Sequence, residues 1–279
     1  MTLLQAAMLG TIQGLSEFLP ISSSGHLVLT RHLFGIPAPG LFFDTSVHIG
    51  TMLAVIVVFR KDLGDLFVAL ARAVRNIPGK GAGGYSDREK TSLRLALLIL
   101  IGSVPTAILG AGLNVLFTDK GLSSVWLVGL MLIVTALILW LTRGRGDNGR
   151  EIIDFGAGRA ILVGCAQGLA VIPGISRSGA TIATGLFLGL NSEDAARLSF
   201  LLSIPAILGA QLLSSRGLMI SGGGGAPLAW PAFIGAVTSF LVGYLALRTL
   251  LRIISHGRLH LFAPYCLVVG LVAIISSLT

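Results

Sequence analysis

The chain contains two similar polar stretches, QGLSEFLPISSSGH at Gln13–His26 and QGLAVIPGISRSGA at Gln167–Ala180, each set within apolar sequence. They align without a gap at a constant offset of 154 residues. The residues that recur at this offset are Gln13, Gly14, Leu15, Ile21, Ser22, Ser24 and Gly25, which match Gln167, Gly168, Leu169, Ile175, Ser176, Ser178 and Gly179. Such internal similarity predicts a structural repeat. We place repeat 1 at about 1–145 and repeat 2 at about 155–279 of a single domain.

The composition favours a membrane protein. Hydrophobic residues make up 54% of 279 positions, charged residues 11%, and the mean hydropathy is +0.90. A spanning helix needs roughly 20 apolar residues. The sequence therefore predicts an all-α integral membrane protein with about six spanning helices. The apolar stretches that indicate spans most clearly are 42–59, Leu93–Phe117, Ser123–Leu141, Leu228–Leu247 and Leu259–Leu278.

The net charge of +8 indicates orientation rather than a nucleic-acid partner, because the basic residues lie next to spans and without interleaved aromatic residues. Sixteen of the twenty Lys and Arg residues fall in Arg60–Arg94, in Arg143–Arg159, in Arg248–Arg258 or at Arg197. The positive-inside rule makes these segments cytoplasmic.

This orientation requires each polar stretch to lie in a re-entrant hairpin. In repeat 1, segments 1–19 and 20–36 enter and return on the outer side. In repeat 2, segments 156–173 and 178–190 do so on the inner side. Three spans separate the copies, an odd number, so the repeat has inverted topology with a binding site near the membrane midplane. The chain breaks that allow the turns are Pro20, Gly25, Pro173, Gly174 and Gly179.

Each polar stretch precedes a short apolar helix, expected at Leu27–Phe34 and Ile182–Leu190. Hydroxyl and backbone N–H groups at a helix N-terminus bind anions, phosphate above all. A helix cap or a small-residue packing surface is the alternative for one stretch alone. The pairing of two stretches favours a phosphate site formed by Ser22, Ser24, Gly25, Ser176, Ser178 and Gly179.

The two copies differ where chemistry would occur: Glu17, Ser23 and His26 of the first become Val171, Arg177 and Ala180 in the second. An ionisable residue within a membrane segment indicates function by default. We expect an acid–base and nucleophile set in repeat 1, with His26 able to activate Ser23, and an anion clamp in repeat 2. The alternatives are a structural Arg177–Glu17 ion pair and a histidine that only fills space.

A cation site is expected beside these residues. Gln13 and Glu17 lie four residues apart and so share one helix face, where their oxygens could hold a hard cation together with substrate phosphates. Asp44 is the other acid next to an apolar span and completes the predicted site, although a boundary charge facing water is an equal alternative. His48 is expected to serve in packing or at an interface.

Four motifs resemble one known family: QGLSEFLPISSSGH, FDTSVHIGTMLAV, PGISRSGAT and GLNSEDAARLSFLLSIPAILGA resemble those of undecaprenyl-diphosphate phosphatase, also called bacitracin resistance protein. The resemblance extends from about Gln5 to Gln211. It implies hydrolysis of undecaprenyl diphosphate to undecaprenyl phosphate and inorganic phosphate, with a divalent cation (Mg²⁺ or Ca²⁺). It also implies a bacterial cytoplasmic membrane enzyme that is a homodimer and opens its active site to the outer side.

The resemblance assigns Glu17 as cation ligand or base, Ser23 as nucleophile, His26 as proton carrier and Arg177 as transition-state clamp, and it adds Thr181 as a further polar position. Direct attack by water stays open as a second mechanism. A polyprenyl-phosphate transporter or flippase stays open as a second function, because paired re-entrant hairpins also build transport sites.

Overall fold

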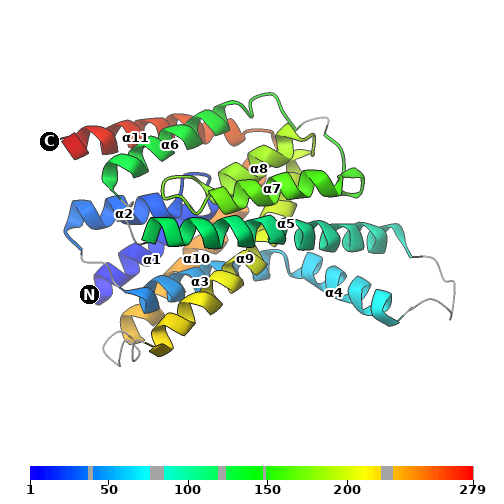
Figure 1. Ribbon diagram of the computed structural model, residues 1–279, viewed down its shortest axis with the longest axis horizontal. Coiled ribbons are helices and arrows are strands. Elements are labelled where there is room, and N and C mark those ends of the chain that lie inside the picture. Colours follow the sequence, from blue (N-terminus) through cyan, green and yellow to red (C-terminus); the bar gives the residue numbers. More distant parts are fainter. Residues whose placement is uncertain (37–39, 76–84, 119–123, 147–148, 221–228, 279) are drawn as a thin grey trace.

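The computed structural model describes the chain apart from residues 37–39, 76–84, 119–123, 147–148, 221–228 and 279, and its side chains apart from 114–118 and 214–220 as well. Within this part the chain is helical, and an isolated bridge between Arg150 and Leu190 is its one extended pairing (Figure 1). The elements in order are α1 (Leu3–Phe18), α2 (Ser23–Phe34), α3 (Leu41–Val58), α4 (Arg60–Arg75), α5 (Asp87–Thr118), α6 (Val125–Trp140), η1 (Ile152–Asp154), α7 (Ala157–Leu169), α8 (Arg177–Phe187), α9 (Ser192–Ile220), α10 (Ala229–Ile254), η3 (Leu259–Phe262) and α11 (Ala263–Leu278).

The prediction of a multi-pass helical membrane protein is confirmed. Among the described residues, five helical segments are long and apolar enough to cross a membrane: Leu41–Val58, Asp87–Leu113, Ser192–Leu213, Ala229–Ile254 and Leu259–Leu278. The apolar helix α6 is shorter, with 16 residues. It corresponds to the remaining predicted span.

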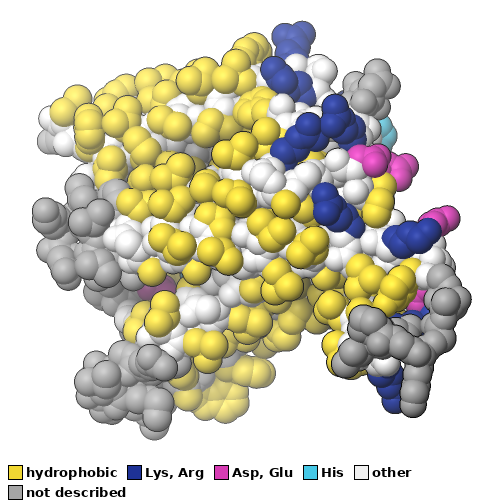
Figure 2. All heavy atoms as spheres, turned by 45° about the vertical axis from the view of Figure 1, so that its right-hand side comes forward, with side chains coloured by type: hydrophobic (Ala, Val, Ile, Leu, Met, Phe, Trp, Pro, Cys, Tyr) yellow, Lys and Arg dark blue, Asp and Glu magenta, His cyan; other side chains and the backbone are white. Residues whose placement is uncertain are grey.

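The surface has the pattern that a bilayer requires. Figure 2 shows a broad hydrophobic area over the body of the molecule and Lys and Arg side chains gathered at one end. Large apolar side chains are openly exposed on three of the long helices, as at Leu100 (64%), Leu245 (64%) and Val272 (60%). An apolar area this extensive marks a surface that contacts lipid rather than water.

The sequence did not predict helix α4, because the charged residues of this stretch indicated a basic loop. Its apolar residues nevertheless recur at helical spacing between the charges, the pattern of an amphipathic helix. It buries Leu66 and Ala69, packs against α5, and leaves Phe67 (75%) and Val74 (70%) exposed. This part of the basic segment is therefore an ordered helix with an apolar outer face.

Glycines let two pairs of helices approach closely. Helix α1 packs along α10, and helix α7 packs along α5. A Cβ on Gly10 would lie 2.4 Å from the carbonyl oxygen of Gly235, and one on Gly164 would lie 2.1 Å from that of Gly102. Small residues at such positions allow backbones to pack against one another in lipid. These contacts fix α1 and α7, the helices that lead into the two polar stretches.

Candidate active site

The first polar stretch forms a turn between α1 and α2. Helix α1 ends at Phe18, and Pro20 lies in the turn that follows. Ser22 has a φ of 72°, a left-handed conformation that is costly for a residue with a side chain. Its Oγ accepts a hydrogen bond from the Gly25 backbone N–H at 3.3 Å. Ser22 thus caps α2, which begins at Ser23 rather than at the expected Leu27 because this cap starts the helix inside the motif.

The second polar stretch also contains a serine cap at the start of a helix. Helix α7 ends at Leu169, and Gly174 turns the chain with a φ of 98°. The Oγ of Ser176 accepts a hydrogen bond from the Gly179 N–H at 3.1 Å and caps α8. Helix α8 therefore begins at Arg177, ahead of the expected Ile182, and its first turn carries the polar residues.

The two turns touch each other. A Cβ on Gly25 would lie 3.3 Å from the Cα of Gly174, and one on Gly179 would lie 3.2 Å from the Cβ of Pro20. The N-termini of α2 and α8 are therefore neighbours, although their sequences are 154 residues apart. Two helix N-termini side by side offer free N–H groups and partial positive charge to one anion.

Helix α6 holds the second turn tightly. The hydroxyl of Thr135 donates to the Gly174 carbonyl at 3.0 Å and accepts from the Ser176 N–H at 3.1 Å. A Cβ on Gly174 would lie 2.5 Å from the carbonyl oxygen of Val128 and 2.7 Å from the Cβ of Met131. Glycine is thus required here both for its conformation and for space.

We expect Gly174→Ala to lower the free energy of unfolding by about 2–4 kcal/mol, since it adds a steric clash to an unfavourable φ. Thermal unfolding of the purified variant in detergent measures the loss. Gly189→Ala is the matched control, because Gly189 also has a positive φ, 91°, but has open space around its Cβ position. Equal losses in the two variants would show that contact with α6 contributes nothing.

Glu17 is the centre of the polar cluster. Its side chain is 5% exposed and forms an ion pair with Arg177 through one carboxylate oxygen. The other oxygen accepts from the Ser23 hydroxyl at 2.5 Å and from the Gln13 amide at 2.9 Å. The structure therefore brings together four residues that sequence analysis selected from both polar stretches.

An ion pair with Glu17 is what a purely structural role for Arg177 predicts. The geometry nevertheless leaves other N–H groups of Arg177 able to bind a second group. Only its Nη2 contacts Glu17, while a guanidinium carries five N–H donors on three nitrogens. Its side chain is 23% exposed. Arg177 can therefore hold Glu17 and an anion at the same time.

His26 is placed differently from expectation. The hydroxyl of Ser23 donates to Glu17, and no hydrogen bond joins Ser23 to His26 among the described residues. The imidazole instead contacts the Ser22 carbonyl through Nδ1 and the Tyr265 hydroxyl through Nε2, both at 2.8 Å. Glu17 is thus the side chain that accepts the hydrogen bond of the Ser23 hydroxyl. Nothing in the local sequence indicated Tyr265, because it lies on α11, far along the chain.

The remaining predicted phosphate ligands divide into two groups. Ser24 is exposed at the N-terminus of α2, and Ser178 lies with Ser176 in the first turn of α8 with their hydroxyls 3.3 Å apart. Thr181 is different, since its hydroxyl donates to the Arg177 carbonyl at 2.8 Å and contacts the Ser199 hydroxyl at 2.5 Å. Thr181 therefore joins α8 to α9 behind the turn.

Asp44 does not join the cluster directly. Its carboxylate has no hydrogen bond or ion pair to Gln13 or Glu17 in the described part of the chain. His48 is near enough to the carboxylates of both Glu17 and Asp44 to interact electrostatically with each. Its Nδ1 is 2.7 Å from the Asp44 carbonyl oxygen. His48, expected to serve in packing or at an interface, thus belongs to the surroundings of the cluster.

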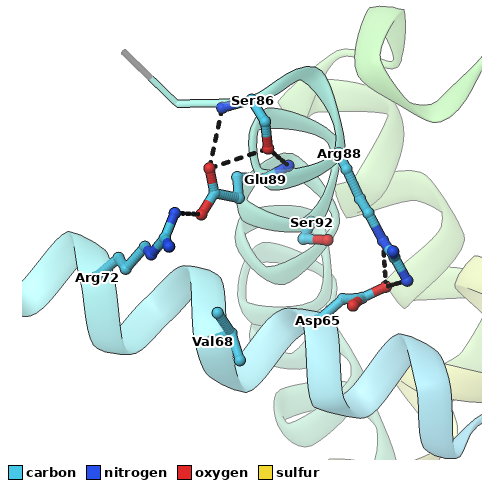
Figure 3. A pocket seen from close by; sticks show the side chains of 7 residues that line it. All are labelled: Asp65, Val68, Arg72, Ser86, Arg88, Glu89 and Ser92. Atoms are coloured by element: carbon cyan, nitrogen blue, oxygen red, sulfur yellow. Dashed lines mark hydrogen bonds and ion pairs between the residues drawn. The ribbon is translucent and has the colours of Figure 1, made fainter. Parts of the chain in front are cut away.

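A cavity of about 430 Å³ lies elsewhere, between α4 and the start of α5 (Figure 3). Its charged side chains neutralise one another: Arg72 pairs with Glu89, and Arg88 pairs with Asp65 at 2.7 Å. None of the residues lining it belongs to the predicted site. This cavity is therefore separate from the cluster around Glu17.

Fold and cluster together define a helical membrane protein with a buried acid–serine–arginine site at two joined helix N-termini. The sequence model of the family "Bacitracin resistance protein BacA" matches residues 6–272, and the chain belongs to this family. The chain is 56% identical over 267 residues to the undecaprenyl-diphosphatase of Desulfosudis oleivorans, covering 96% of each protein. It is 49% identical to that of Desulforapulum autotrophicum, covering 99% of each, and 44% identical to that of Korarchaeum cryptofilum, covering 100% of each.

Proposed function

We propose that this protein hydrolyses undecaprenyl diphosphate to undecaprenyl phosphate and inorganic phosphate. One observation carries the proposal: the Ser23 hydroxyl donates to the Glu17 carboxylate at 2.5 Å, beside Arg177 and two helix N-termini. The arrangement supplies a nucleophile, a base and an anion clamp in one place. The names of the relatives supply the substrate, and the apolar surface suits a lipid carrier.

The terminal phosphate of the substrate binds where α2 and α8 begin. Backbone N–H groups of both helices and the hydroxyls of Ser24 and Ser178 donate to its oxygens. The free N–H groups of Arg177 bind the same phosphate in a charge-assisted contact. These donors face the charge that develops in the transition state, and such preorganised donors contribute most where water is excluded.

In the chemical step, the Ser23 oxygen attacks the terminal phosphorus while Glu17 takes the hydroxyl proton. The bond from that phosphorus to the bridging oxygen breaks, and undecaprenyl phosphate leaves with the bridging oxygen. Water then attacks the phosphoserine, releases inorganic phosphate and restores the serine hydroxyl. In the alternative mechanism Glu17 or His26 activates water directly, and no covalent intermediate forms.

A divalent cation fits the site through Gln13 and Glu17. The Oε1 of Gln13 is fully buried and has no hydrogen-bond partner within the described part of the chain, so it is an acceptor available to a cation. The described residues hold no cluster of three or more His, Cys, Asp or Glu side chains suited to a metal. Mg²⁺ commonly binds with one or two carboxylates and substrate phosphates, and it would neutralise phosphate charge here. Asp44 would then act at longer range.

The inverted repeat and its re-entrant hairpins belong to the same proposal. Helix contacts support it, since α1 packs on α10 as α7 packs on α5, and α3 packs on α10 as α9 packs on α5. Two further contacts, of α6 with α11 and of α3 with α9, each join a helix of the first half to the equivalent helix of the second half. Exchanging the halves therefore maps these contacts onto one another, as a two-fold axis in the membrane plane requires.

The proposed orientation opens the active site to the outer side of the cytoplasmic membrane. The basic end of the molecule in Figure 2 would face the cytoplasm. Both chain ends lie away from this basic end, at the left of Figure 1, together with the start of α1 and the end of α2. We include a homodimer in the proposal because large apolar side chains such as Leu245 and Val272 leave ample surface for a second copy.

The purified protein in detergent is expected to release phosphate from undecaprenyl diphosphate when Mg²⁺ or Ca²⁺ is added. A chelator should reduce the rate at least about tenfold if the cation neutralises phosphate charge, and added cation should restore it. Vesicles that contain the protein provide the contrasting assay. Lipid that crosses the membrane without phosphate release would establish the transporter function instead.

A further inference from the structure

Helix α11 reaches the first polar turn from a distant part of the sequence. The Tyr265 hydroxyl lies 2.8 Å from Nε2 of His26. The two rings are stacked, with centroids 5.6 Å apart and planes 10° from parallel. The next residue, Cys266, places its Sγ 3.5 Å from the Pro20 carbonyl oxygen. Two successive residues of α11 thus hold both sides of the turn.

The hydrogen bonds determine which nitrogen of His26 carries a proton. The Ser22 carbonyl oxygen can only accept, so Nδ1, at 2.8 Å, must donate. In a neutral imidazole Nε2 then has the lone pair, which accepts from the Tyr265 hydroxyl. The left-handed backbone of Ser22 and the position of α11 together fix this tautomer and the ring plane.

Both ring nitrogens are therefore engaged, which explains why His26 does not bond to Ser23. An imidazole held only by the Ser22 carbonyl could rotate about its side-chain bonds. The stacked ring and hydroxyl of Tyr265 remove that freedom. Side chains in an active site are effective only when neighbouring groups hold them near the productive geometry.

We infer that Tyr265 is a positioning residue for the hydrolysis: its hydroxyl and ring hold His26 in the Nδ1–H tautomer and fix the plane of the imidazole beside the first polar turn. The inference rests on the proposed function and on the role of proton carrier that the resemblance assigns to His26. Tyr265 is itself 45% exposed, so this contact lies at the surface of the protein. No motif of the polar stretches contains this residue.

Tyr265→Phe tests the inference because it keeps the stacked ring and removes only the hydroxyl. We expect kcat to fall about tenfold, the effect of one lost hydrogen bond, with KM changed less than about twofold. Tyr244→Phe is the matched control: that hydroxyl lies on α10, 3.0 Å from Nη1 of Arg248, and the variant should keep wild-type kcat. A wild-type kcat in Tyr265→Phe would overturn the inference.

A double variant separates this inference from the proposed function. His26→Ala should lose most activity, and adding Tyr265→Phe should then reduce kcat no further, because the hydroxyl acts through His26. If His26→Ala keeps full activity, the proposed role of His26 fails. If His26→Ala is inactive but Tyr265→Phe is normal, only the role of Tyr265 fails. An additional loss in the double variant would also contradict a positioning role.

Nitrogen NMR of the histidine-labelled protein tests the tautomer without relying on activity. The wild-type protein should show His26 protonated on Nδ1 alone, with the signal assigned by its absence from His26→Ala. Tyr265→Phe should give a mixture of tautomers. A wild-type His26 protonated on Nε2 alone would overturn the inference, whatever the behaviour of the variants.

Discussion

Arg177→Ala is expected to lower kcat about a thousandfold or more, because it removes the guanidinium that is ion-paired with Glu17 beside both helix N-termini. Losing a single preorganised donor to a developing oxyanion costs about 10²–10³ in rate, and an arginine that stabilises a transferring phosphoryl group contributes about 10³–10⁵. Phosphate release under saturating substrate measures the effect. Arg177→Lys should recover only part of the loss, since an ammonium lacks the planar fork of donors.

Stability must be separated from catalysis in this variant. Arg177→Ala leaves the Glu17 carboxylate buried without its partner, and breaking a buried pair on one side costs about 3–5 kcal/mol. Glu17→Gln combined with Arg177→Ala removes both charges and should recover most of that stability. It should stay inactive. A destabilised Arg177→Ala that keeps wild-type kcat would mean that Arg177 is structural.

Arg197→Ala provides a matched control. The Arg197 side chain is also 23% exposed and is also ion-paired, to Asp62 at 2.5 Å. It lies on α9, away from the two polar turns. Its loss should lower stability and leave kcat within about twofold, since its charge does not reach the reacting phosphate. Equal losses of kcat at both arginines would argue against a specific clamp.

The sequence was sufficient to predict the polar cluster because its signals are local. Gln13 and Glu17 share a helix face through their spacing, and Ser23 and Arg177 occupy the same place in two copies of one motif. The serine caps are an exception, since α2 and α8 begin earlier than the sequence predicted. Spacing and repetition thus carried the prediction.

Other features depend on tertiary structure and had no such signal. The Ser23 hydroxyl donates to Glu17 rather than to His26. The preceding residue, Ser22, adopts a left-handed conformation, which no propensity indicates for serine. Tyr265 contacts His26 only because α11 packs beside α6. Asp44 lies next to an apolar span like a site residue, yet its helix places it outside hydrogen-bonding distance of the cluster.

Ser23→Ala is expected to reduce phosphate release about ten-thousandfold, comparable to the loss of a catalytic nucleophile in hydrolases that form covalent intermediates. The reason is geometric: among the described residues, the Ser23 hydroxyl is the one that donates to the Glu17 carboxylate. Ser24→Ala is the adjacent control. Ser24 is exposed, and within the described part of the chain its hydroxyl contacts the Ser22 hydroxyl alone, at 3.4 Å, so its loss should cost a few-fold through weaker phosphate binding.

Rapid quenching decides between the two mechanisms. Substrate labelled in its terminal phosphate should leave label on the wild-type protein, in a peptide that contains Ser23, and none on Ser23→Ala. Glu17→Gln should form this adduct slowly, because the serine then lacks a base. Direct attack by water makes the opposite prediction: no labelled protein at any time, and measurable turnover in Ser23→Ala. Since the hydroxyl already rests against the carboxylate, in line to lose its proton, the structure favours the phosphoserine.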